Sequence, residues 1–556
     1  TGATFDRTTS RGLTAEQFYS TASYQNGDLR GIVLTSNDLS GWDLSGQDLT
    51  GALFSSTGFD DVLLEDAIIA HALIRGISAE QLYSTASYRS GDLTGIDIGG
   101  VPLRGWDLEG QNLTDATLRR AVFEDTNLRD AIIRGADLSD TTDSGFTESL
   151  LRTTASFQSG DLTGVDLTEN DLRGWDFSGL NLSDADFRLS RTEGTSFRDS
   201  VLAGAGLSSL DLRGVDLSGA DLTGAFLSRA RLYGADLSGA EITHAWLDRV
   251  TENGFTAQQL YSTASYQRGD LQGINFFFNT MNGWDFSGQR LTQASLVNTE
   301  LVGADFTGSD LTMAVMRESL ALGASFVSAD LDRADLSRSS LIGADLTGAY
   351  LGNAGLTNTS LFNANLTGAD LRGALSVSNF MILAAASQRN LIRPDGLAPS
   401  IAIDAGETLR LWDHAPVHDQ SPISIVVTNE FIMQDGGTLR AVFEDEQWGG
   451  LITFESADGT GVDVQLAGTL ELAFDTSLAP ADLAMLNGTV FQLFDWTNAN
   501  REGAFAAISY TGLGFFETDR LLSEGEVTYR IPAPASFSLI VAAAAWTRRR
   551  RPLLDA

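Results

Sequence analysis

The chain has 556 residues, of which 43% are hydrophobic and 20% are charged, so it can bury a large core and is not disordered by composition. Its formal net charge of −37 argues against nucleic-acid binding by phosphate neutralisation. Because cysteine is absent, disulfides, metal–thiolate sites and a cysteine nucleophile are excluded. The first residue is Thr rather than Met, so we expect a fragment or a processed form of a longer chain.

Four related segments, each beginning with a glycine, interrupt the N-terminal half of the chain. We expect each to form a short helix. Thr14 and Gln17 fit a capping box, as do Ser78 and Gln81 in the second segment. The fourth segment has the same pair, the third keeps only its threonine, and a glycine follows each as a plausible helix end. The segments lie near residues 12–27, 76–91, 145–160 and 254–269.

Between these segments, a large apolar residue stands at every fifth position. From Leu207 to Leu247 every fifth residue is Leu or Ile, and a small or aliphatic residue, usually alanine, stands two positions earlier. A period of five matches neither an amphipathic helix nor an alternating strand. The pattern therefore predicts a solenoid over residues 1–375, in which each unit buries its apolar side by stacking on its neighbours.

The repeated motif A(D/N)LxG resembles the pentapeptide-repeat family and covers about two thirds of the chain. The resemblance implies a mainly β fold, a right-handed quadrilateral β-helix with one pentapeptide per side and four per coil. It also implies that the central Leu or Phe and the Ala before it point inward, while the other three positions face water. Successive coils would then lie one strand spacing apart, about 4.8 Å.

The first coil after each helical segment carries an inward tryptophan, such as Trp42 and Trp284, where other coils have Ala. A tryptophan would overpack a stack of alanine-sized positions. One hypothesis is that each of these coils is wider and terminal, with the helix covering its end, so that the solenoid is a string of capped segments. The alternative is a continuous rod with helices on its side.

After the repeats, residues 376–400 form a transition, in which the apolar run from Phe380 to Ala386 is expected to cap the last coil. Residues 401–531 alternate apolar and polar positions and predict a β-rich domain, either a sandwich or a β-roll continuing the solenoid axis. Asp435-Gly-Gly, Asp458-Gly and Asn487-Gly separate the strands and are typical of hairpin turns.

The C-terminal segment, residues 532–556, combines a Pro-x-Pro motif, an apolar run and an arginine cluster. This layout resembles the PEP-CTERM sorting signal, although Ala533 stands where that family has Glu. The resemblance implies export, at least transient membrane anchoring and cleavage by a sorting protease. The physics is consistent with such a signal, because the apolar run is shorter than the about 20 residues that span a bilayer and the arginines hold the end on the cytoplasmic side. A simple short anchor or a degenerate helix is the alternative. The motif residues are Pro532, Pro534, Arg548, Arg549, Arg550 and Arg551.

Few residues suggest chemistry. His414 and His418 form an H-x3-H motif beside two aspartates and are weak metal-ligand candidates, but Pro416 argues against the helix that would bring them together. His71 and His244 are expected to face solvent within the repeats. Stacked aspartates of the repeat could bind Ca²⁺ loosely, although Asp is also the repeat's own consensus residue on a solvated side. These aspartates are Asp211, Asp216, Asp221 and Asp236.

We therefore expect a non-catalytic repeat protein, secreted or at the cell surface, that acts as a scaffold or as an interaction surface. We expect no cofactor, no catalytic residue and no nucleic-acid partner, and the open choice for a partner is a protein or a glycan. Two alternatives remain. An acidic DNA-mimic inhibitor fits the net charge but not the C-terminal segments. A polysaccharide-active β-helix enzyme would need clustered acids and bases in a groove, which the regular repeat lacks.

Overall fold

The structure is a computed structural model. It describes residues 2–413, 423–443, 448, 450–456, 458–474, 480–511 and 514–531. The chain forms two compact units, unit 1 (Thr1–Thr280) and unit 2 (Met281–Ala556).

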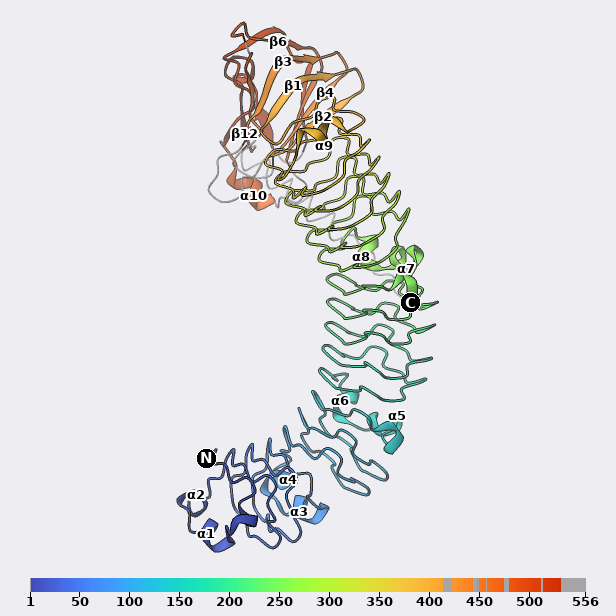
Figure 1. Ribbon diagram of the computed structural model, residues 1–556, viewed down its shortest axis with the longest axis vertical. Coiled ribbons are helices and arrows are strands. Elements are labelled where there is room, and N and C mark those ends of the chain that lie inside the picture. The colour runs from blue at the N-terminus through green and yellow to red at the C-terminus, as the bar shows by residue number, and fades with distance from the viewer. Residues whose placement is uncertain are drawn as a thin grey trace. The chain divides into compact units, whose positions relative to one another are not determined.

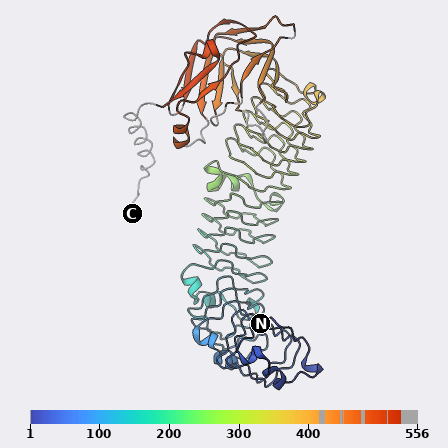
Figure 2. The ribbon, with the colours of Figure 1, turned by 90° about the vertical axis from the view of Figure 1, so that its left-hand side faces the viewer.

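Unit 1 is a β-helix built from coils of twenty residues. Short parallel bridges join each side of a coil to the same side of the next, as between Asp216 and Asp236, and the Leu217 amide donates to the Asp236 carbonyl at 2.8 Å. The central residues Leu212, Leu222 and Leu232 are fully buried. The predicted five-residue sides and inward leucines are confirmed, and Figures 1 and 2 show the coils as stacked loops within each unit.

Each side ends in a corner where the backbone turns with positive φ. In one regular coil, Gly214 and Gly219 adopt φ values of 65° and 68°. Glycine takes this conformation without steric cost, and aspartate and asparagine tolerate it better than other residues. This requirement explains why the last position of the pentapeptide is so often glycine.

Each helical segment contains two short helices rather than the single predicted helix. A threonine caps the second helix of each segment; Thr85, for example, accepts a hydrogen bond from the Tyr88 amide. In the second and fourth segments the same threonine also ends the first helix. The predicted capping boxes are present in the first, second and fourth segments. The helices are α1 (Ala15–Tyr19), α2 (Ala22–Gln25), α3 (Ala79–Ser84), α4 (Ala86–Ser90), α5 (Glu148–Leu151), α6 (Ala155–Gln158), α7 (Ala257–Ser262) and α8 (Ala264–Gln267).

One side of the β-helix continues across every helical segment. Leu73 bridges Asp97, Asp137 bridges Asp166, and Trp246 bridges Asn275, each pair spanning one insertion. The helices therefore replace part of one coil and lie on the side of the solenoid, as α5 to α8 show in Figure 1. The hypothesis of separately capped segments is wrong for unit 1, and the continuous alternative holds there.

The inward tryptophan packs against the helical segment that precedes it in the chain. Trp42 is 7% exposed, and its ring centroid lies 5.2 Å from that of Phe18 in α1. Trp175 lies 6.0 Å from Phe146 in the same way. The longer helical insertion widens the coil, so the tryptophan fills space that a regular coil does not have.

Three of the four insertions carry an additional 3₁₀ turn, and a buried asparagine on the following coil holds it. Asn170 Oδ1 accepts hydrogen bonds from the Thr141 and Thr142 amides at 2.9 Å each, while its Nδ2 donates to the Leu138 and Leu167 carbonyls. Asn37 and Asn279 hold η1 (Thr9–Arg11) and η3 (Thr251–Asn253) as Asn170 holds η2 (Thr142–Ser144).

The second insertion has Val101 at the equivalent position, and its residues, all of which are described, form no 3₁₀ turn. The bridge across it spans 24 residues, from 73 to 97, whereas those across the third and fourth span 29, from 137 to 166 and from 246 to 275. The asparagine is therefore found in the insertions that have five additional residues. Its side chain accepts hydrogen bonds from backbone amides of those residues.

Side chains of the helices also replace missing backbone partners of the next coil. The Asp43 amide donates to Tyr19 Oη at 2.6 Å, and Tyr24 Oη donates to the Asp43 carbonyl at 2.8 Å. In the third segment Glu148 accepts from the Asp176 amide at 3.1 Å, and Arg152 donates to the Asp176 carbonyl. The Tyr19–Tyr24 pair and the Glu148–Arg152 pair thus supply hydrogen bonds to the equivalent backbone position of two different coils.

Unit 2 begins with further regular coils. Phe286, Phe306 and Phe326 stack along the core with centroid distances of 5.0 Å. The apolar run after the repeats forms α9 (Asn379–Leu383), in which Phe380 is 81% exposed. It does not cap the last coil as expected, because the ladder continues past it, from Asn365 to Ser387 and from Asp370 to Ile392.

The β-domain that follows contains two parallel sheets, and the strands from β1 to β4 alternate between them. One sheet has the order β1-β3-β6-β9, with β5 also paired to β3, and the other has the order β10-β7-β4-β2. The first sheet contains β1 (Leu397–Ile403), β3 (Ile425–Met433), β5 (Ile452–Phe454), β6 (Val462–Leu466) and β9 (Ala499–Gly503). The second contains β2 (Thr408–Leu411), β4 (Thr438–Phe443), β7 (Thr469–Phe474) and β10 (Ala507–Thr511).

The hairpin prediction is wrong at all three glycine turns. Asp435-Gly-Gly joins β3 to β4, which belong to different sheets. Asp458-Gly joins β5 to β6, which both pair in parallel with β3. Asn487-Gly follows α10 (Pro480–Met485) and precedes β8 (Val490–Gln492), so it joins a helix to a strand.

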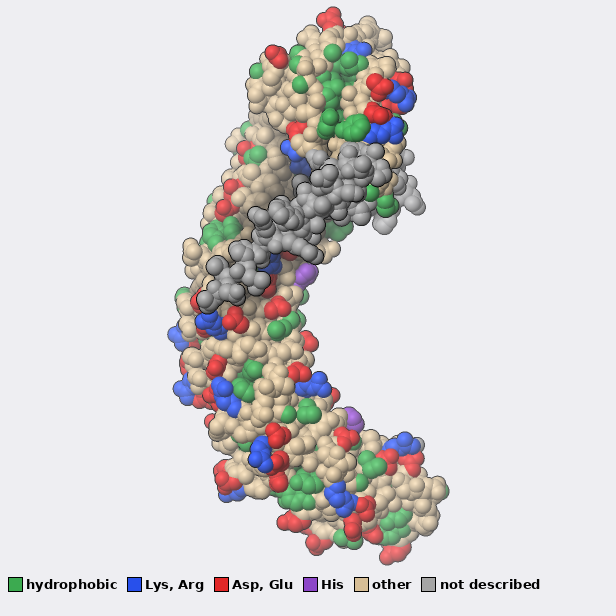
Figure 3. Space-filling view, turned by 180° about the vertical axis from the view of Figure 1, so that it is seen from behind, with side chains coloured by type: hydrophobic (Ala, Val, Ile, Leu, Met, Phe, Trp, Pro, Cys, Tyr) green, Lys and Arg blue, Asp and Glu red, His purple; other side chains and the backbone are tan. Residues whose placement is uncertain are grey.

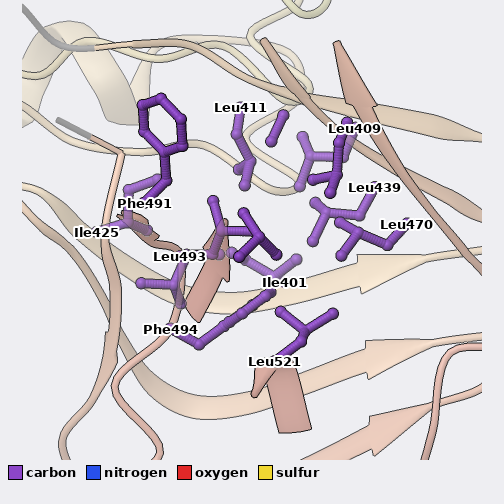
Figure 4. Packing of buried hydrophobic residues seen from close by; sticks show 14 of the residues in the cluster. Ile401, Leu409, Leu411, Ile425, Leu439, Leu470, Phe491, Leu493, Phe494 and Leu521 are labelled. Carbon is purple, nitrogen blue, oxygen red and sulfur yellow. The ribbon is translucent and has the colours of Figure 1, made fainter. Parts of the chain in front are cut away.

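The core of the β-domain lies between its sheets. Leu409, Leu439 and Leu470 form a row across the second sheet and are buried. Figure 4 shows this row near Ile401 of the first sheet and Leu521 of α11 (Leu521–Glu524). A small antiparallel sheet, β11 (Phe515–Glu517), β12 (Glu526–Arg530) and β8, closes the domain with Phe491 in the same core.

Candidate functional site

The sequence-predicted site residues do not come together in the part of the chain that the structure describes. His414 and His418 lie outside the described residues, and their metal-binding role stays a prediction. Pro532, Pro534, Arg548, Arg549, Arg550 and Arg551 also lie outside them. Among the described residues, no group of three or more His, Asp or Glu side chains could hold a metal ion. Within the same residues, no helix is long and apolar enough to cross a bilayer.

His71 and His244 occupy equivalent corners of two different coils. Both are exposed and adopt positive φ values of 57° and 60°. Each imidazole lies over a glycine of the next coil, Gly95 and Gly273 respectively. The histidines are therefore solvent-facing corner residues, and their separation along the solenoid keeps them from acting as a pair.

The aspartates of the repeat form hydrogen bonds within the corners of the coil in which they stand. Asp216 Oδ1 accepts hydrogen bonds from the Ser218 amide and hydroxyl at 2.9 and 2.5 Å. Asp211 forms a bidentate pair with Arg213, whose hydrogen bonds are the main cause of the lowered pKa of Asp211. In this arrangement the carboxylates order the turn, and only Asp216 and Asp236 of the four candidates bridge each other.

The surface of the coils carries charges of both signs. On the face shown in Figure 3, acidic and basic side chains are interspersed and hydrophobic side chains are scattered. One exception in unit 1 is an aromatic group on consecutive coils. Phe226 and Trp246 are 43% and 44% exposed with centroids 5.8 Å apart, and Phe278 lies under the Arg249 guanidinium. The Phe226 and Trp246 rings are tilted by 36° to each other, and Phe278 is 46% exposed.

In unit 2, the last coils bury charged residues against the β-domain. Arg372 and Asp370 form an ion pair whose side chains are 0% and 1% exposed. Arg372 also donates to the carbonyls of Trp412 and Ile423 at 2.8 and 3.0 Å. The Trp412 ring stacks on Tyr350 at 5.3 Å. The sequence could not reveal this cluster, because Asp370-Leu-Arg372 is part of a pentapeptide that does not differ from the others of the repeat.

Asp330 lies on the same column of the solenoid, bridged to Asp310 and Tyr350. Desolvation raises its pKa from 3.8 to about 7, and nearby Asp310 and Asp332 add to the increase. The Asp332 amide donates to Asp330 Oδ1 at 2.9 Å, and nearby Arg410 partly opposes the increase. Asp330 is therefore a carboxyl group whose pKa lies near neutral pH, and burial also raises the pKa of the neighbouring Asp332.

We expect the stability of unit 2 to fall as pH rises from about 4 to about 7, because folded Asp330 keeps a proton that the unfolded chain releases. Thermal unfolding followed by circular dichroism at pH 5.5 and 8.0 checks this. Asp330→Asn keeps the acceptor for the Asp332 amide and should flatten the pH dependence. Asp216→Asn, in a regular corner, is the control. An equal pH dependence in wild type and Asp330→Asn would contradict the assignment.

The coils, their parallel bridges and the buried central residues define a β-helical repeat protein. The family model of pentapeptide repeats matches in eight copies, among them residues 103–141, 155–188, 181–219, 216–251, 270–308, 299–338 and 339–375. The solenoid of this chain therefore belongs to the pentapeptide-repeat family. Among curated proteins, none matches the sequence.

Several solved structures of pentapeptide-repeat proteins are similar to parts of the chain. HetL, involved in heterocyst differentiation regulation in the cyanobacterium Nostoc sp. strain PCC 7120, is 29% identical over 45% of this chain and 97% of its own, with a TM-score of 0.19. A thylakoid-lumen protein of Arabidopsis thaliana is 32% identical over 19% of this chain and 72% of its own, with a TM-score of 0.16. QnrB1, a plasmid-mediated fluoroquinolone resistance protein, is 16% identical over 40% and 90%, with a TM-score of 0.15. At these TM-scores the likenesses carry no argument about what this chain binds.

Proposed function

We propose that this chain is a non-catalytic scaffold at the cell surface or outside the cell, whose solenoid presents side chains to a partner. The observation that carries the proposal is the unbroken ladder of unit 1, in which bridges such as Leu73 to Asp97 cross the insertions. A ladder of this kind fixes the positions of outward side chains over many coils. Because pentapeptide-repeat proteins are generally non-catalytic, membership of the family supports the same reading.

The surface chemistry supports an interaction role. Carboxylates such as Asp216 are hydrogen-bonded within their own corners, so they stabilise the coil and are not poised for acid–base catalysis. The exposed group of Phe226, Trp246 and Phe278 combines aromatic faces with the Arg249 guanidinium. Aromatic and arginine side chains are enriched where proteins bind partners.

Export rests on the resemblance of residues 532–556 to a sorting signal. An apolar run followed by arginines favours a C-terminus retained on the cytoplasmic side of a membrane. The β-domain that precedes this segment would then lie outside the membrane, together with the solenoid. The resemblance implies that a sorting protease cuts near Pro532 and Pro534.

We expect the full chain to fractionate with the cell envelope of its host and to react with antibody on intact cells. A chain ending at Ile531 should be released into the medium, because it lacks the anchoring segment. Immunoblots of cytoplasm, envelope and medium measure this, and mass spectrometry of the mature C-terminus reports cleavage. A control with Arg338→Gln should fractionate as wild type. Full-length chain found only in the cytoplasm would contradict the proposal.

A further inference from the structure

Unit 2 contains a cleft of about 440 Å³ between the corners of its last coils and the second sheet of the β-domain. Ser328, Gly348 and Gly368 form the solenoid wall, and Thr408, Leu409 and Arg440 contribute to the opposite wall. This volume lies within the range of about 300–1,000 Å³ that small-molecule sites occupy.

The cleft exists because two stacked corners have no side chains. Gly348 and Gly368 adopt φ values of 65° and 67°, the same corner geometry as in the regular coils. A Cβ added at Gly368 would lie 3.2 Å from Leu409 Cδ1, so a larger residue would crowd the cleft. Trp412 Nε1 donates to the Gly348 carbonyl at 3.1 Å and holds the sheet against this wall.

Two arginines, Arg410 and Arg440, line the cleft, and the Arg410 guanidinium lies 3.5 Å from the centre of the Trp412 ring. The Nε of Arg440 is buried, makes no hydrogen bond to the described residues and forms a long ion pair of 3.8 Å with a carboxylate oxygen of Glu471. The side chain is 43% exposed, so its terminal nitrogens can reach a ligand. The one carboxylate in the lining, Glu407, is already paired with Arg389. A guanidinium in this state matches a ligand carboxylate in planar, bidentate geometry.

The remaining lining suits a hydroxylated ring. Ser328 and Thr408 are exposed on opposite walls. Each hydroxyl can both donate and accept a hydrogen bond. Leu409 also lines the cleft, although only 4% of its surface is exposed. A sugar has this combination of polar edges and apolar faces, and an acidic sugar adds the carboxylate for Arg440.

We propose that this cleft binds an acidic saccharide, with Arg440 pairing its carboxylate and Ser328 and Thr408 contacting its hydroxyl groups. The inference rests on the proposed function in one respect, namely that the ligand is bound and not converted. It does not depend on export or on the aromatic group of unit 1.

Isothermal titration calorimetry of the full chain tests the proposal with three probes: digalacturonate, the neutral disaccharide cellobiose and inorganic phosphate. We expect digalacturonate to bind and the other two to bind at least about tenfold more weakly, because only the acidic sugar uses both the guanidinium and the hydroxyls. Arg440→Gln should weaken digalacturonate binding by about tenfold or more. Thr408→Trp, which fills the cleft from an exposed strand position, should abolish it.

Arg338→Gln, on an exposed coil surface of the same unit, is the matched control and should bind as wild type. Circular dichroism of each variant verifies folding. The proposal would be overturned if wild type did not bind digalacturonate, or if both cleft variants bound it with unchanged affinity. If phosphate bound as tightly as digalacturonate, the cleft would be an anion site and the saccharide assignment would be wrong. Chromatography of the recovered ligand keeps the two claims separate: cleavage of digalacturonate would overturn the non-catalytic function while leaving the binding site intact.

Discussion

Arg372→Met is expected to lower the free energy of unfolding of unit 2 by about 3–5 kcal/mol, because it leaves the Asp370 carboxylate buried without its partner. The substitution also removes the donors to the Trp412 and Ile423 carbonyls, which link the last coils to the β-domain. Urea unfolding followed by circular dichroism measures the loss.

The chain offers a matched control for this prediction. Asp211-Leu-Arg213 has the same local sequence and the same bidentate pair, but Arg213 is 52% exposed. Arg213→Met should therefore have little effect on the free energy of unfolding. The double variant Asp370→Asn, Arg372→Met should be more stable than Arg372→Met alone, because it removes the unpaired charge. Equal losses for Arg372→Met and Arg213→Met would show that burial of the first pair has no energetic consequence.

Asn170→Val is the second variant for which we expect a large effect, a loss of about 3–5 kcal/mol in unit 1. The 1% exposed amide satisfies the Thr141 and Thr142 amides and two carbonyls, and valine leaves these buried backbone groups without partners. Thermal unfolding measures the loss. Hydrogen exchange should show faster exchange of the Thr141 and Thr142 amides.

The second insertion supplies the reciprocal test. Val101 stands where Asn170 would be, in a coil without the 3₁₀ turn. Val101→Asn buries an amide that lacks these partners and should also destabilise the protein, by about 1–3 kcal/mol. If Asn170→Val proved neutral, the hydrogen bonds to η2 would not hold the turn, and the difference between the insertions would need another cause.

The sequence is most informative where structure depends on local spacing. A leucine or isoleucine at every fifth position, as from Leu207 to Leu247, can be buried on one side only if the chain turns every five residues. The capping residues Thr14 and Gln17 likewise act within a single turn. These features follow from neighbouring residues, so the solenoid and the helix starts could be predicted.

Features that depend on distant partners could not be predicted. An Asp-Gly turn is compatible with a hairpin and with a bend between two parallel sheets, and the difference lies in where the next strand pairs. Asp370-Leu-Arg372 and Asp211-Leu-Arg213 differ only in what covers them. The cleft at Arg440 arises in the same way, because β4 and the corner at Gly348 are far apart in the sequence.

The continuous ladder beside the insertions has a consequence for how such chains can change in length. Gly145 and Gly254 begin successive insertions of the same kind and are 109 residues apart, the same interval that separates Asp137 from Trp246 and Asn170 from Asn279. Excising one such interval would place Asp137 opposite Asn275, and every side chain that faces the core would still face it. The molecule can therefore shorten or grow by whole cassettes through recombination while each remaining residue keeps its orientation.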